Sequence, residues 1–532
     1  MDNSRPRILS GKIFLYITEF FAGMSVMAVE LGAGRLLAPY FSSSQIVWTI
    51  IIGTIMIAMA LGNVLGGKWA DKNPDPDRLY RRILIAAVWL AAVPFAGKFV
   101  MIGISALLVL TVSTNFLIFA AFLTCMTVFV FPLFLLGTVT PSLVKFTVDS
   151  LDENAGTIGK LNASNTVGSI IGTFIPTFIS IPAVGTAATF VIFAAVLLII
   201  AAVYFISVRR GALKTVTAAI LVVLLGIPGI LTGFAFWEKD TVYEGESVYN
   251  YLRVSEDEKQ VILSTNVIFG VQSIYMKNGG LTGMYYDYAA AAPLMTGTAD
   301  SSKDILILGM GTGTFALRCR EYFDNVNIEG VEIDGKITSL AEKYFNLPSD
   351  IKVTEYDGRA FLNVCRDKYD VILVDAYQDI TIPFQMSSKE FFTLVKEHLK
   401  EGGVMAVNLN MHSDASDSIN SYLCDTVSEV FGSVYTVNVR GSTNRELFAS
   451  DDPKMTDIFT ENISSVRDDD FRFLMGDISC SLMPYESTGL VLTDDKAPVE
   501  LLGMKVIDGM ISDQLAYYKE RFKTEGIDAL IY

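Results

Sequence analysis

The chain has 532 residues, of which 51% are hydrophobic and only 18% charged, and its mean hydropathy is +0.43. Its 57 acidic and 41 basic residues give a net charge of −16, which argues against a nucleic-acid partner and suits a cationic small substrate. Five cysteines without paired spacing and two histidines predict neither a disulfide framework nor a metal site.

The first 237 residues predict a multi-pass α-helical membrane domain in the cell membrane, with the lipid bilayer as its partner. Apolar runs long enough to cross a bilayer recur throughout this part of the chain. We expect seven spans, at about residues 13–38, 46–67, 83–112, 115–137, 158–181, 186–207 and 215–236.

Basic residues fall in alternate connections between these spans, at residues 5–12, 68–82, 145 and 209–214. The positive-inside rule therefore predicts a cytoplasmic amino terminus. Seven spans would then place the rest of the chain outside, whereas a nucleoside cofactor made in the cytosol favours the cytoplasmic face. The face of the soluble part is left open.

Three further features of the membrane part bear on its packing or function. The stretch GNVLGGKWADKNPDPDRLYRR, residues 62–82, resembles the loop between the second and third helices of major facilitator transporters. Polar residues within the spans indicate pairing or a polar pathway, and they include Glu19, Glu30, Arg35 and Asn165. The small residues Gly156, Gly159, Gly168 and Gly172 suit close helix packing.

Residues 238–297 predict a small antiparallel β-sheet. Short strand-like stretches at 242–243, 249–254, 261–264 and 273–276 are separated by turn residues. A helix-compatible segment follows at 285–296.

Residues 298–532 predict an α/β Rossmann-like domain of the methyltransferase type. Strand candidates at 305–308, 328–333, 351–354, 370–374 and 403–408 follow the order of a doubly wound sheet, in which ligands sit at the carboxyl ends of strands. The residues at those ends are polar or glycine: Gly309 to Gly313, Glu332, Asp357 and Asp375. Glycines allow a tight turn close to a ligand, and a carboxylate about 20 residues on can accept both ribose hydroxyls. A nucleoside-containing ligand is therefore predicted.

Residues 240–500 resemble spermidine synthase and related aminopropyltransferases. The resemblance rests on motifs in the family's order: GESVYNYLRV, Gly270-Val271-Gln272-Ser273, Tyr285-Tyr286-Asp287 at the family's Tyr-His-Glu segment, GMGTG, VEID, YDGRAF, ILVDAY and LTDDKAPVELL. The whole chain looks like the membrane-fused spermidine synthase-like proteins.

This resemblance implies a role for each matching residue. Asp375, as general base, and Tyr285 would be catalytic. Glu332 would hold the ribose hydroxyls and Asp357 the adenine amino group of decarboxylated S-adenosylmethionine or S-adenosylmethionine. The implied cofactor-binding residues are Gln272, Gly309, Gly311, Thr312, Gly313, Glu332, Asp334, Asp357 and Gly358. The implied substrate-binding residues are Asp287, Tyr286, Tyr377, Gln378, Asp379 and Asp495.

The resemblance implies a membrane-bound aminopropyltransferase that acts on an amine such as putrescine, releases methylthioadenosine and allows a homodimer. Thr312 stands where the family normally carries an Asp, and this leaves methyl transfer or an elimination reaction of intact S-adenosylmethionine as a second hypothesis. A third hypothesis is transport of a polyamine or nucleoside by the membrane part, with the soluble part sensing or consuming it.

Overall fold

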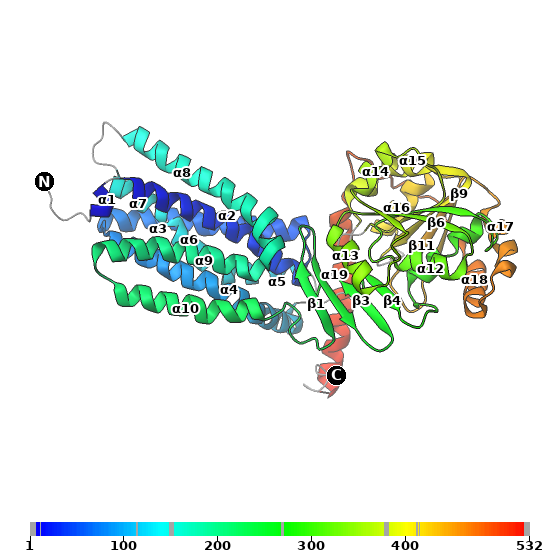
Figure 1. Cartoon of the computed structure of the whole chain (residues 1–532), viewed down its shortest axis with the longest axis horizontal. Coiled ribbons are helices and arrows are strands. Elements are labelled where there is room, and N and C mark those ends of the chain that lie inside the picture. Colours follow the sequence, from blue (N-terminus) through cyan, green and yellow to red (C-terminus); the bar gives the residue numbers. More distant parts are fainter. Residues whose placement is uncertain are drawn as a thin grey trace. The chain divides into compact units, whose positions relative to one another are not determined.

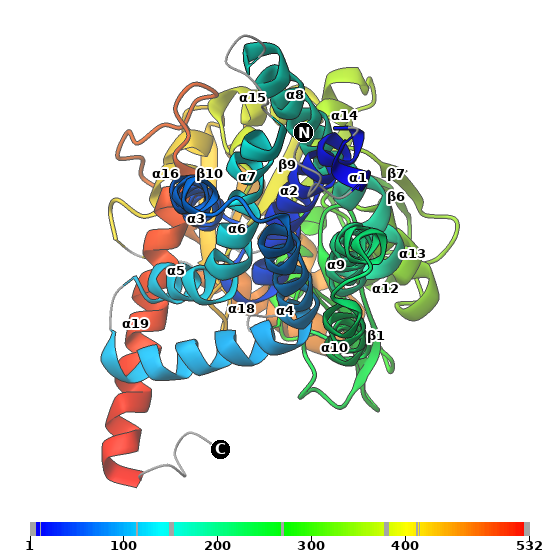
Figure 2. The same cartoon turned by 90° about the vertical axis from the view of Figure 1, so that its left-hand side faces the viewer.

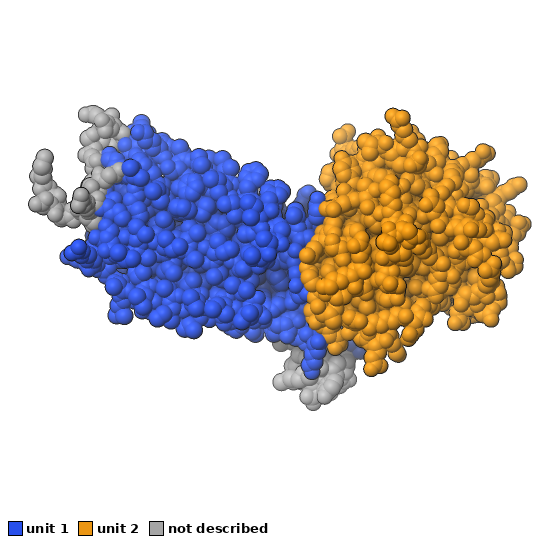
Figure 3. Space-filling model, in the orientation of Figure 1, with its two compact units in different colours: residues 1–239, 244–251, 514–532 blue, residues 240–243, 252–513 orange. Residues whose placement is uncertain are grey.

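The computed structural model describes residues 7–525, except for residues 11, 113–114, 148–153, 268–270, 377–381, 411–412 and 414. The chain divides into two compact units (Figure 3). Unit 1 comprises Met1–Lys239, Glu244–Tyr251 and Gln514–Tyr532, and unit 2 comprises Asp240–Tyr243 and Leu252–Asp513.

Unit 1 is a bundle of apolar helices (Figure 1), of which α3, α9 and α10 are seen nearly end-on in Figure 2. The helices are α1 (Arg7–Ser10), α2 (Ile13–Phe41), α3 (Gln45–Lys72), α4 (Pro76–Thr111), α5 (Phe116–Val128), α6 (Val130–Gly137), α7 (Val139–Thr147), α8 (Asn154–Ile175), the π-helix η1 (Pro176–Ser180), α9 (Ile181–Val208) and α10 (Ala212–Leu231).

Six segments of the described chain are long and apolar enough to cross a membrane, which differs from the seven expected. They are Ile13–Phe41, Gln45–Lys72, Pro76–Leu108, Val130–Thr147, Ala155–Val208 and Ala212–Leu231. The fifth and sixth expected spans are continuous in the 54 residues of Ala155–Val208, which contain a kink at Gly185, where φ is 83° and ψ is 166°. The expected span 115–137 is broken into the short helices α5 and α6.

Close packing of α2 against α8 depends on small residues. A Cβ atom on Gly168 would lie 2.0 Å from the carbonyl oxygen of Phe20, and one on Gly172 would lie 2.1 Å from that of Met24. Gly156 and Gly159 have open space instead, since no described residue outside their own helix turn lies within 4 Å of a Cβ built on either of them. Only part of the predicted small-residue pattern therefore makes the helix contact.

The polar residues of the spans are tied into the bundle. Glu19 is fully buried, and its Oε1 accepts hydrogen bonds from Thr140 Oγ1 at 2.6 Å and from Asn165 Nδ2 at 2.8 Å. Arg35 donates to the carbonyl oxygen of Val248. The structure thus gives Glu19 and Arg35 partners within unit 1.

The basic connections gather at one end of this bundle. Lys145 pairs with Asp71 at 2.9 Å, and Tyr204 donates to Asp77 at 2.5 Å, so the turns that follow α3, α7 and α9 lie together. The chain that follows α10 lies at the other end of the bundle from α1 (Figure 1). There Lys98 donates to the carbonyl oxygen of Gly233 at 3.0 Å, and the backbone N–H of Thr186 donates to Glu246 at 2.6 Å.

Two sheets follow the bundle in the chain. The first is antiparallel with the order β1-β2-β3-β4, formed by β1 (Thr241–Glu246), β2 (Tyr251–Glu256), β3 (Gln260–Ser264) and β4 (Ser273–Met276). The second has eight strands in the order β12-β10-β11-β9-β8-β5-β6-β7. Its strands are β5 (Lys303–Leu308), β6 (Val326–Glu332), β7 (Lys352–Glu355), β8 (Tyr369–Val374), β9 (Leu399–Leu409), β10 (Ser433–Asn438), β11 (Arg445–Ser450) and β12 (Met483–Pro484).

Strands β5 to β9 pair in parallel, as the predicted Rossmann-like order requires, and β11 pairs antiparallel with β9. Further helices of the chain are α11 (Tyr285–Ala289), η2 (Ala292–Met295), α12 (Thr314–Tyr322), α13 (Gly335–Tyr344), α14 (Gly358–Val364), η3 (Phe384–Met386), α15 (Lys389–Glu397), α16 (Ile419–Ser428), α17 (Met455–Asn462), η4 (Ile463–Ser465), α18 (Asp469–Ser481) and α19 (Val499–Glu525).

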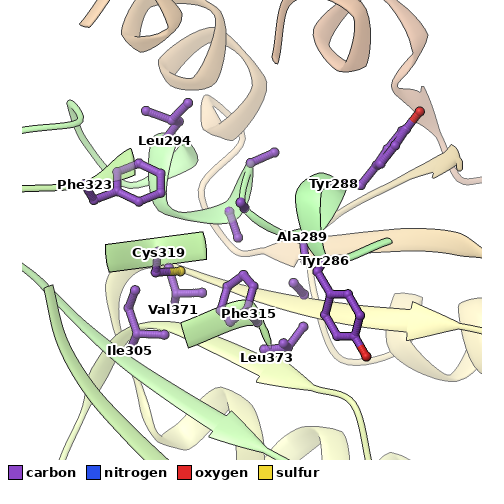
Figure 4. Packing of buried hydrophobic residues seen from close by; sticks show 14 of the residues in the cluster. Tyr286, Tyr288, Ala289, Leu294, Ile305, Phe315, Cys319, Phe323, Val371 and Leu373 are labelled. Atoms are coloured by element: carbon purple, nitrogen blue, oxygen red, sulfur yellow. The ribbon is translucent and has the colours of Figure 1, made fainter. Parts of the chain in front are cut away.

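The large sheet is buried on both faces, which explains why its parallel strands are continuous apolar runs. On one face Val371 and Leu373 of β8 pack with Phe315 and Cys319 of α12 and with residues of α11 (Figure 4). On the other face the intervening side chains of β8 pack with α14, α15 and α16. The carboxyl edge of the parallel strands therefore lies between two rigid layers.

Candidate active site

The glycine turn after β5 is shaped so that only glycine fits at its first position. Gly309, Gly311 and Gly313 have φ angles of 88°, 54° and 87°. A Cβ atom on Gly309 would lie 2.5 Å from the carbonyl oxygen of Asp375. The turn and the end of β8 are therefore in direct backbone contact, and Gly313 then precedes α12.

Glu332, at the end of β6, is held by the backbone of this turn. Its Oε2 accepts from the N–H of Gly311 at 2.8 Å, and its Oε1 accepts from the N–H of Asp334 at 3.0 Å. Burial raises the pKa of Glu332 to about 6, although the hydrogen bonds from Asp334 and Gly311 oppose that rise. The carboxylate is thus fixed beside the turn, where ribose hydroxyls of a nucleoside would need an acceptor.

Asp375, directly after β8, is held from two sides. Tyr285 Oη donates to its Oδ2 at 2.6 Å, and Asn408 Nδ2 donates to its Oδ1 at 3.0 Å. Burial raises the pKa of Asp375 to about 7; the two hydrogen bonds lower it and the charge of Glu332 raises it. A carboxylate with such a pKa is suited to proton transfer near neutral pH.

The pKa of Tyr285 lies well above its usual value, because the side chain is buried and faces Asp375. Tyr285 therefore stays protonated and acts as a donor to Asp375. Its ring lies against that of Tyr286, with 3.9 Å between the ring centroids, and Tyr286 donates to the carbonyl oxygen of Gln272 at 2.5 Å. Tyr286 and Tyr288 point away from each other in Figure 4, so these two side chains of α11 pack on opposite sides of the helix.

Asp287 is buried at the start of α11. Its Oδ2 accepts from Gly283 N–H at 2.7 Å and from Thr282 Oγ1 at 2.9 Å, while its Oδ1 has no hydrogen-bond partner in the described part of the chain. Burial raises the pKa of Asp287, and these two hydrogen bonds and the charge of Arg318 oppose the rise. One carboxylate oxygen of Asp287 thus holds the turn before α11.

Three predicted residues lie at helix starts. Asp334 precedes α13 and accepts from Lys336 N–H at 3.1 Å, and Asp357 precedes α14 and accepts from Ala360 N–H at 2.8 Å. Gly358 begins α14, and a Cβ atom there would lie 3.2 Å from Met386 Cε. One carboxylate oxygen of Asp334 and one of Asp357 are therefore engaged in capping.

The turn also contacts the small sheet. Thr312 N–H donates to Ser273 Oγ at 3.2 Å, beside the half-buried Gln272. Thr312 Oγ1 is buried and has no hydrogen-bond partner among the described residues. A hydroxyl in that state is available to a ligand in the turn.

Of the remaining predicted residues, only Asp495 is described, and the structure does not bring it into this constellation. Tyr377, Gln378 and Asp379 lie outside the described residues. Asp495 is exposed in the turn closed by Thr493 and Lys496, whereas its neighbour Asp494 pairs with Arg359 of α14 at 2.7 Å.

Sequence reasoning missed two polar residues that lie beside Asp375. Asn408, on β9, donates to Asp375, and its own Oδ1 accepts from Asn444 Nδ2 at 2.8 Å. Glu446, on β11, pairs in register with Asn408. The signal in the sequence was Asn408 within the apolar run VMAVNL and Glu446 directly before the apolar run LFA.

Together these groups offer a glycine turn, a fixed carboxylate for ribose hydroxyls and a carboxylate base at adjacent strand ends. Such a site can hold a nucleoside and take a proton from a nucleophile next to it. The geometry alone leaves the identity of that nucleophile open.

Comparison with known proteins identifies relatives of this chain. A family model described as the spermine/spermidine synthase domain matches residues 284–445. A protein of Bifidobacterium longum (strain NCC 2705), named "Probable polyamine aminopropyl transferase", is 49% identical over 346 residues, which cover 62% of this chain and 77% of that protein.

A polyamine aminopropyltransferase of Vibrio vulnificus (strain CMCP6) is 25% identical over 230 residues, which cover 42% of this chain and 75% of that protein. Among solved structures, spermidine synthase from Thermotoga maritima has 19% sequence identity and a TM-score of 0.36, with 43% of this chain and 79% of that one covered.

Proposed function

The chain belongs to the polyamine aminopropyltransferase family, and we propose that it is a membrane-bound enzyme that transfers the aminopropyl group of decarboxylated S-adenosylmethionine to an amine such as putrescine. Methylthioadenosine is the second product. The observation that carries the proposal is the position of Asp375, a carboxylate with a pKa raised to about 7 at the strand end between the glycine turn and Asn408.

The donor lies on the side of Asp375 that carries β5, β6 and β7. Glu332 accepts the ribose hydroxyls and Asp357 the adenine amino group, and the glycine turn after β5, beside Glu332, lets backbone approach the nucleoside closely. The oriented Glu332 carboxylate and the buried Thr312 hydroxyl, which has no hydrogen-bond partner among the described residues, support this assignment.

Asp375 acts on the acceptor. An ammonium group loses a proton to the Asp375 carboxylate and becomes a neutral amine. The lone pair of that amine then forms a bond to the carbon next to the sulfonium, while the electrons of the carbon–sulfur bond pass to sulfur. The product is a secondary ammonium, and the leaving methylthioadenosine is a neutral thioether. Tyr285 orients Asp375 throughout, because its hydroxyl remains protonated.

Unit 1 anchors the enzyme in the cell membrane with its amino terminus in the cytoplasm. Six segments long and apolar enough to cross a bilayer, and basic connections gathered at one end of the bundle, support this placement.

The test uses the purified full-length protein in detergent, incubated with decarboxylated S-adenosylmethionine and putrescine. We expect release of methylthioadenosine, and Asp375→Asn should lower kcat by about 100- to 10,000-fold, the usual contribution of a general base. Asp304→Asn, a carboxylate on β5 that pairs with Lys400, is the control and should retain activity. Absence of methylthioadenosine with every diamine offered would contradict the proposal.

The second candidate is a reaction of intact S-adenosylmethionine, either methyl transfer or elimination. It is favoured by Thr312, whose buried and unpartnered hydroxyl offers a donor to a cofactor carboxylate where the family carries an Asp. Calorimetry with both forms of the cofactor separates the two candidates. Tighter binding of the intact form would favour this second one.

A further inference from the structure

A buried carboxyl group in the helix bundle has no role in the mechanism above. Glu19 of α2 is 0% exposed, and its Oε1 accepts hydrogen bonds from Thr140 of α7 and Asn165 of α8. Its Oε2 has no hydrogen-bond partner, and no positively charged side chain pairs with it, among the described residues. Hydrocarbon does not stabilise an isolated carboxylate, so an acidic residue in this position indicates a site where a cation binds.

The surroundings of Glu19 suit the smallest cation, a proton. A Cβ atom on Gly23 of α2 would lie 2.6 Å from the carbonyl oxygen of Asn165, so α2 and α8 pack too closely beside Glu19 to admit a hydrated metal ion or an alkylammonium group. The cationic side chains on the neighbouring helices are exposed or have other partners: Lys68 of α3 and Lys160 of α8 are exposed, Lys145 of α7 pairs with Asp71, and Arg82 of α4 donates to Ser142 of α7.

Polar groups lie between Glu19 and the end of the bundle that carries the basic turns. Asp77, in the first turn of α4, accepts from Tyr204, whose ring stacks on that of Tyr80 with 4.0 Å between the centroids. The Tyr80 hydroxyl forms a hydrogen bond of 3.0 Å with Thr18, the residue before Glu19. Because a hydroxyl group both donates and accepts hydrogen bonds, these side chains can bring a proton from Asp77 to the turn of α2 that carries Glu19.

Three more buried hydroxyls lie deeper in the bundle. Ser25 of α2, Thr54 of α3 and Thr124 of α5 are at most 2% exposed, and none of their hydroxyl oxygens has a hydrogen-bond partner among the described residues. Thr49 of α3 and Thr127 of α5, by contrast, donate to the carbonyl oxygen four residues earlier. The helices α2, α3 and α5 pack against one another. Their buried hydroxyls are therefore available to bind along one route.

These groups are spaced along the length of the bundle. With a rise of about 1.5 Å per residue, Glu19 lies about 9 Å and Ser25 about 18 Å from the first residue of α2. The helix α3 runs back from the far end of α2, which places Thr54 at about 28 Å on the same scale. Since the hydrocarbon core of a bilayer is about 30 Å thick, the three levels cover most of that thickness.

We propose that Glu19 and these hydroxyls form a proton pathway through unit 1, in which the Glu19 carboxylate binds the proton and the hydroxyls pass it on. A proton from water at the Asp77 end forms an O–H bond at Oε2 of Glu19, and that bond breaks when the proton moves on. The proposal rests on the membrane placement of unit 1 proposed above and not on aminopropyl transfer. Unit 1 then has an activity of its own besides anchoring.

Proton binding is tested with dicyclohexylcarbodiimide, an apolar reagent that modifies protonated carboxyl groups in apolar surroundings. We expect mass spectrometry to find the adduct on Glu19 of the full-length protein in detergent at mildly acidic pH, and labelling to fall as rising pH removes the proton. The control Asp71→Asn, which removes an exposed carboxylate at the same end of the bundle, should leave this labelling unchanged. Labelling of Glu19 that is absent at every pH, or independent of pH, overturns the proposal.

Proton movement is measured in phosphatidylcholine liposomes that contain the protein and a trapped pH indicator. A potassium gradient with valinomycin makes the interior negative and draws protons inwards. We expect Glu19→Gln to reduce proton entry to the rate of protein-free liposomes, while Asp71→Asn retains the rate of the unmodified protein. Equal entry with and without the Glu19 carboxyl group overturns the pathway.

Thr54→Val tests whether the route continues beyond Glu19. The variant removes a buried hydroxyl and keeps the branched shape, so we expect carbodiimide to label Glu19 as before while proton entry slows. The matched control is Thr49→Val, which removes an exposed hydroxyl of the same helix and should leave proton entry unchanged. Equal proton entry in these two variants overturns the route through α3.

Two further readouts separate this proposal from the proposed function. Flotation of the liposomes on a density gradient reports membrane insertion, and methylthioadenosine release reports catalysis. Glu19→Gln should float and release methylthioadenosine as the unmodified protein does. Protein that does not float would refute the membrane placement, whereas unmodified protein that floats and admits no more protons than empty liposomes overturns the pathway alone.

Discussion

At the scale of single residues, the proposed chemistry depends on the protonation of Asp375. Its pKa of about 7 means that the carboxylate is largely protonated below neutral pH and ionised above it. Only the ionised form accepts a proton. We therefore expect kcat/KM for methylthioadenosine release to rise with pH and to level off above about pH 7.

Tyr285→Phe should move this rise of kcat/KM to higher pH. The hydroxyl of Tyr285 stabilises the charged form of Asp375, so its removal raises the pKa of Asp375 further. The measurement is the pH profile of kcat/KM for the two proteins, with Tyr243→Phe as a control on β1. An unchanged profile would show that Tyr285 does not set the basicity of Asp375.

The polar residues of the site differ in how well the sequence revealed them. The glycine turn, Glu332 and Asp375 each follow an apolar run, and parallel strands bring such ends to one edge of a sheet. Asn408 and Glu446 lie inside apolar strands. Glu446 lies near Asp375 because β11 pairs antiparallel with β9, and no local sequence pattern predicts the register of that pairing.

At the scale of elements, the glycine turn and the end of β8 are in direct backbone contact, so a change in one should disturb the other. Gly309→Ala should distort both, because a Cβ atom there would lie 2.5 Å from the Asp375 carbonyl oxygen, at a φ of 88°. We expect loss of most activity and a lower unfolding temperature. The matched control is Gly441→Ala, where φ is 70° and no described residue beyond the two chain neighbours lies within 4 Å of the added Cβ atom. It carries similar backbone strain without the clash, and equal losses in both variants would contradict the contact.

The packing of α2 on α8 offers a similar comparison in the bundle. Gly168→Leu places a side chain against the backbone of Phe20, whereas Gly159→Leu extends into open space. We expect the first variant to lower the thermal stability of the detergent-purified protein and the second to leave it nearly unchanged. Equal stability of the two variants would argue against this helix contact.

The sequence predicted the parallel strands better than it predicted the membrane helices. The five parallel strands were visible because each is a short apolar run between turn residues. The membrane segments were harder to divide, since hydropathy reports which residues are apolar and not where a helix breaks. The expected span 115–137 contains the break at Phe129 between α5 and α6, and Phe129 is itself apolar. The strands β10 and β11 were not predicted.

At the scale of the whole molecule, the two ends of the helix bundle differ in their basic residues, and this difference bears on membrane topology. The basic turns that follow α3, α7 and α9 lie at the end of the bundle that carries α1, and the chain leaves α10 at the opposite end. With those connections in the cytoplasm, the chain emerges from the bundle on the outer side.

Cys480 on α18 provides a test of that topology without a fusion partner. It is exposed, while Cys125, Cys319 and Cys424 are buried. We expect a membrane-impermeant maleimide to label Cys480 in intact cells, and Cys480→Ser to abolish most of the labelling. Labelling that requires permeabilised cells would place the catalytic residues on the cytoplasmic face, where the nucleoside donor is made.

The place of Asp375 at the same strand edge as Glu332 has a consequence for kinetic order. The proposed donor and acceptor meet at this edge, and Asp375 is a base that takes a proton, not a nucleophile that takes the aminopropyl chain. Both substrates must then be present together, so initial-rate plots should intersect, as in a sequential mechanism. Without an acceptor, labelled methylthioadenosine should not exchange into the donor.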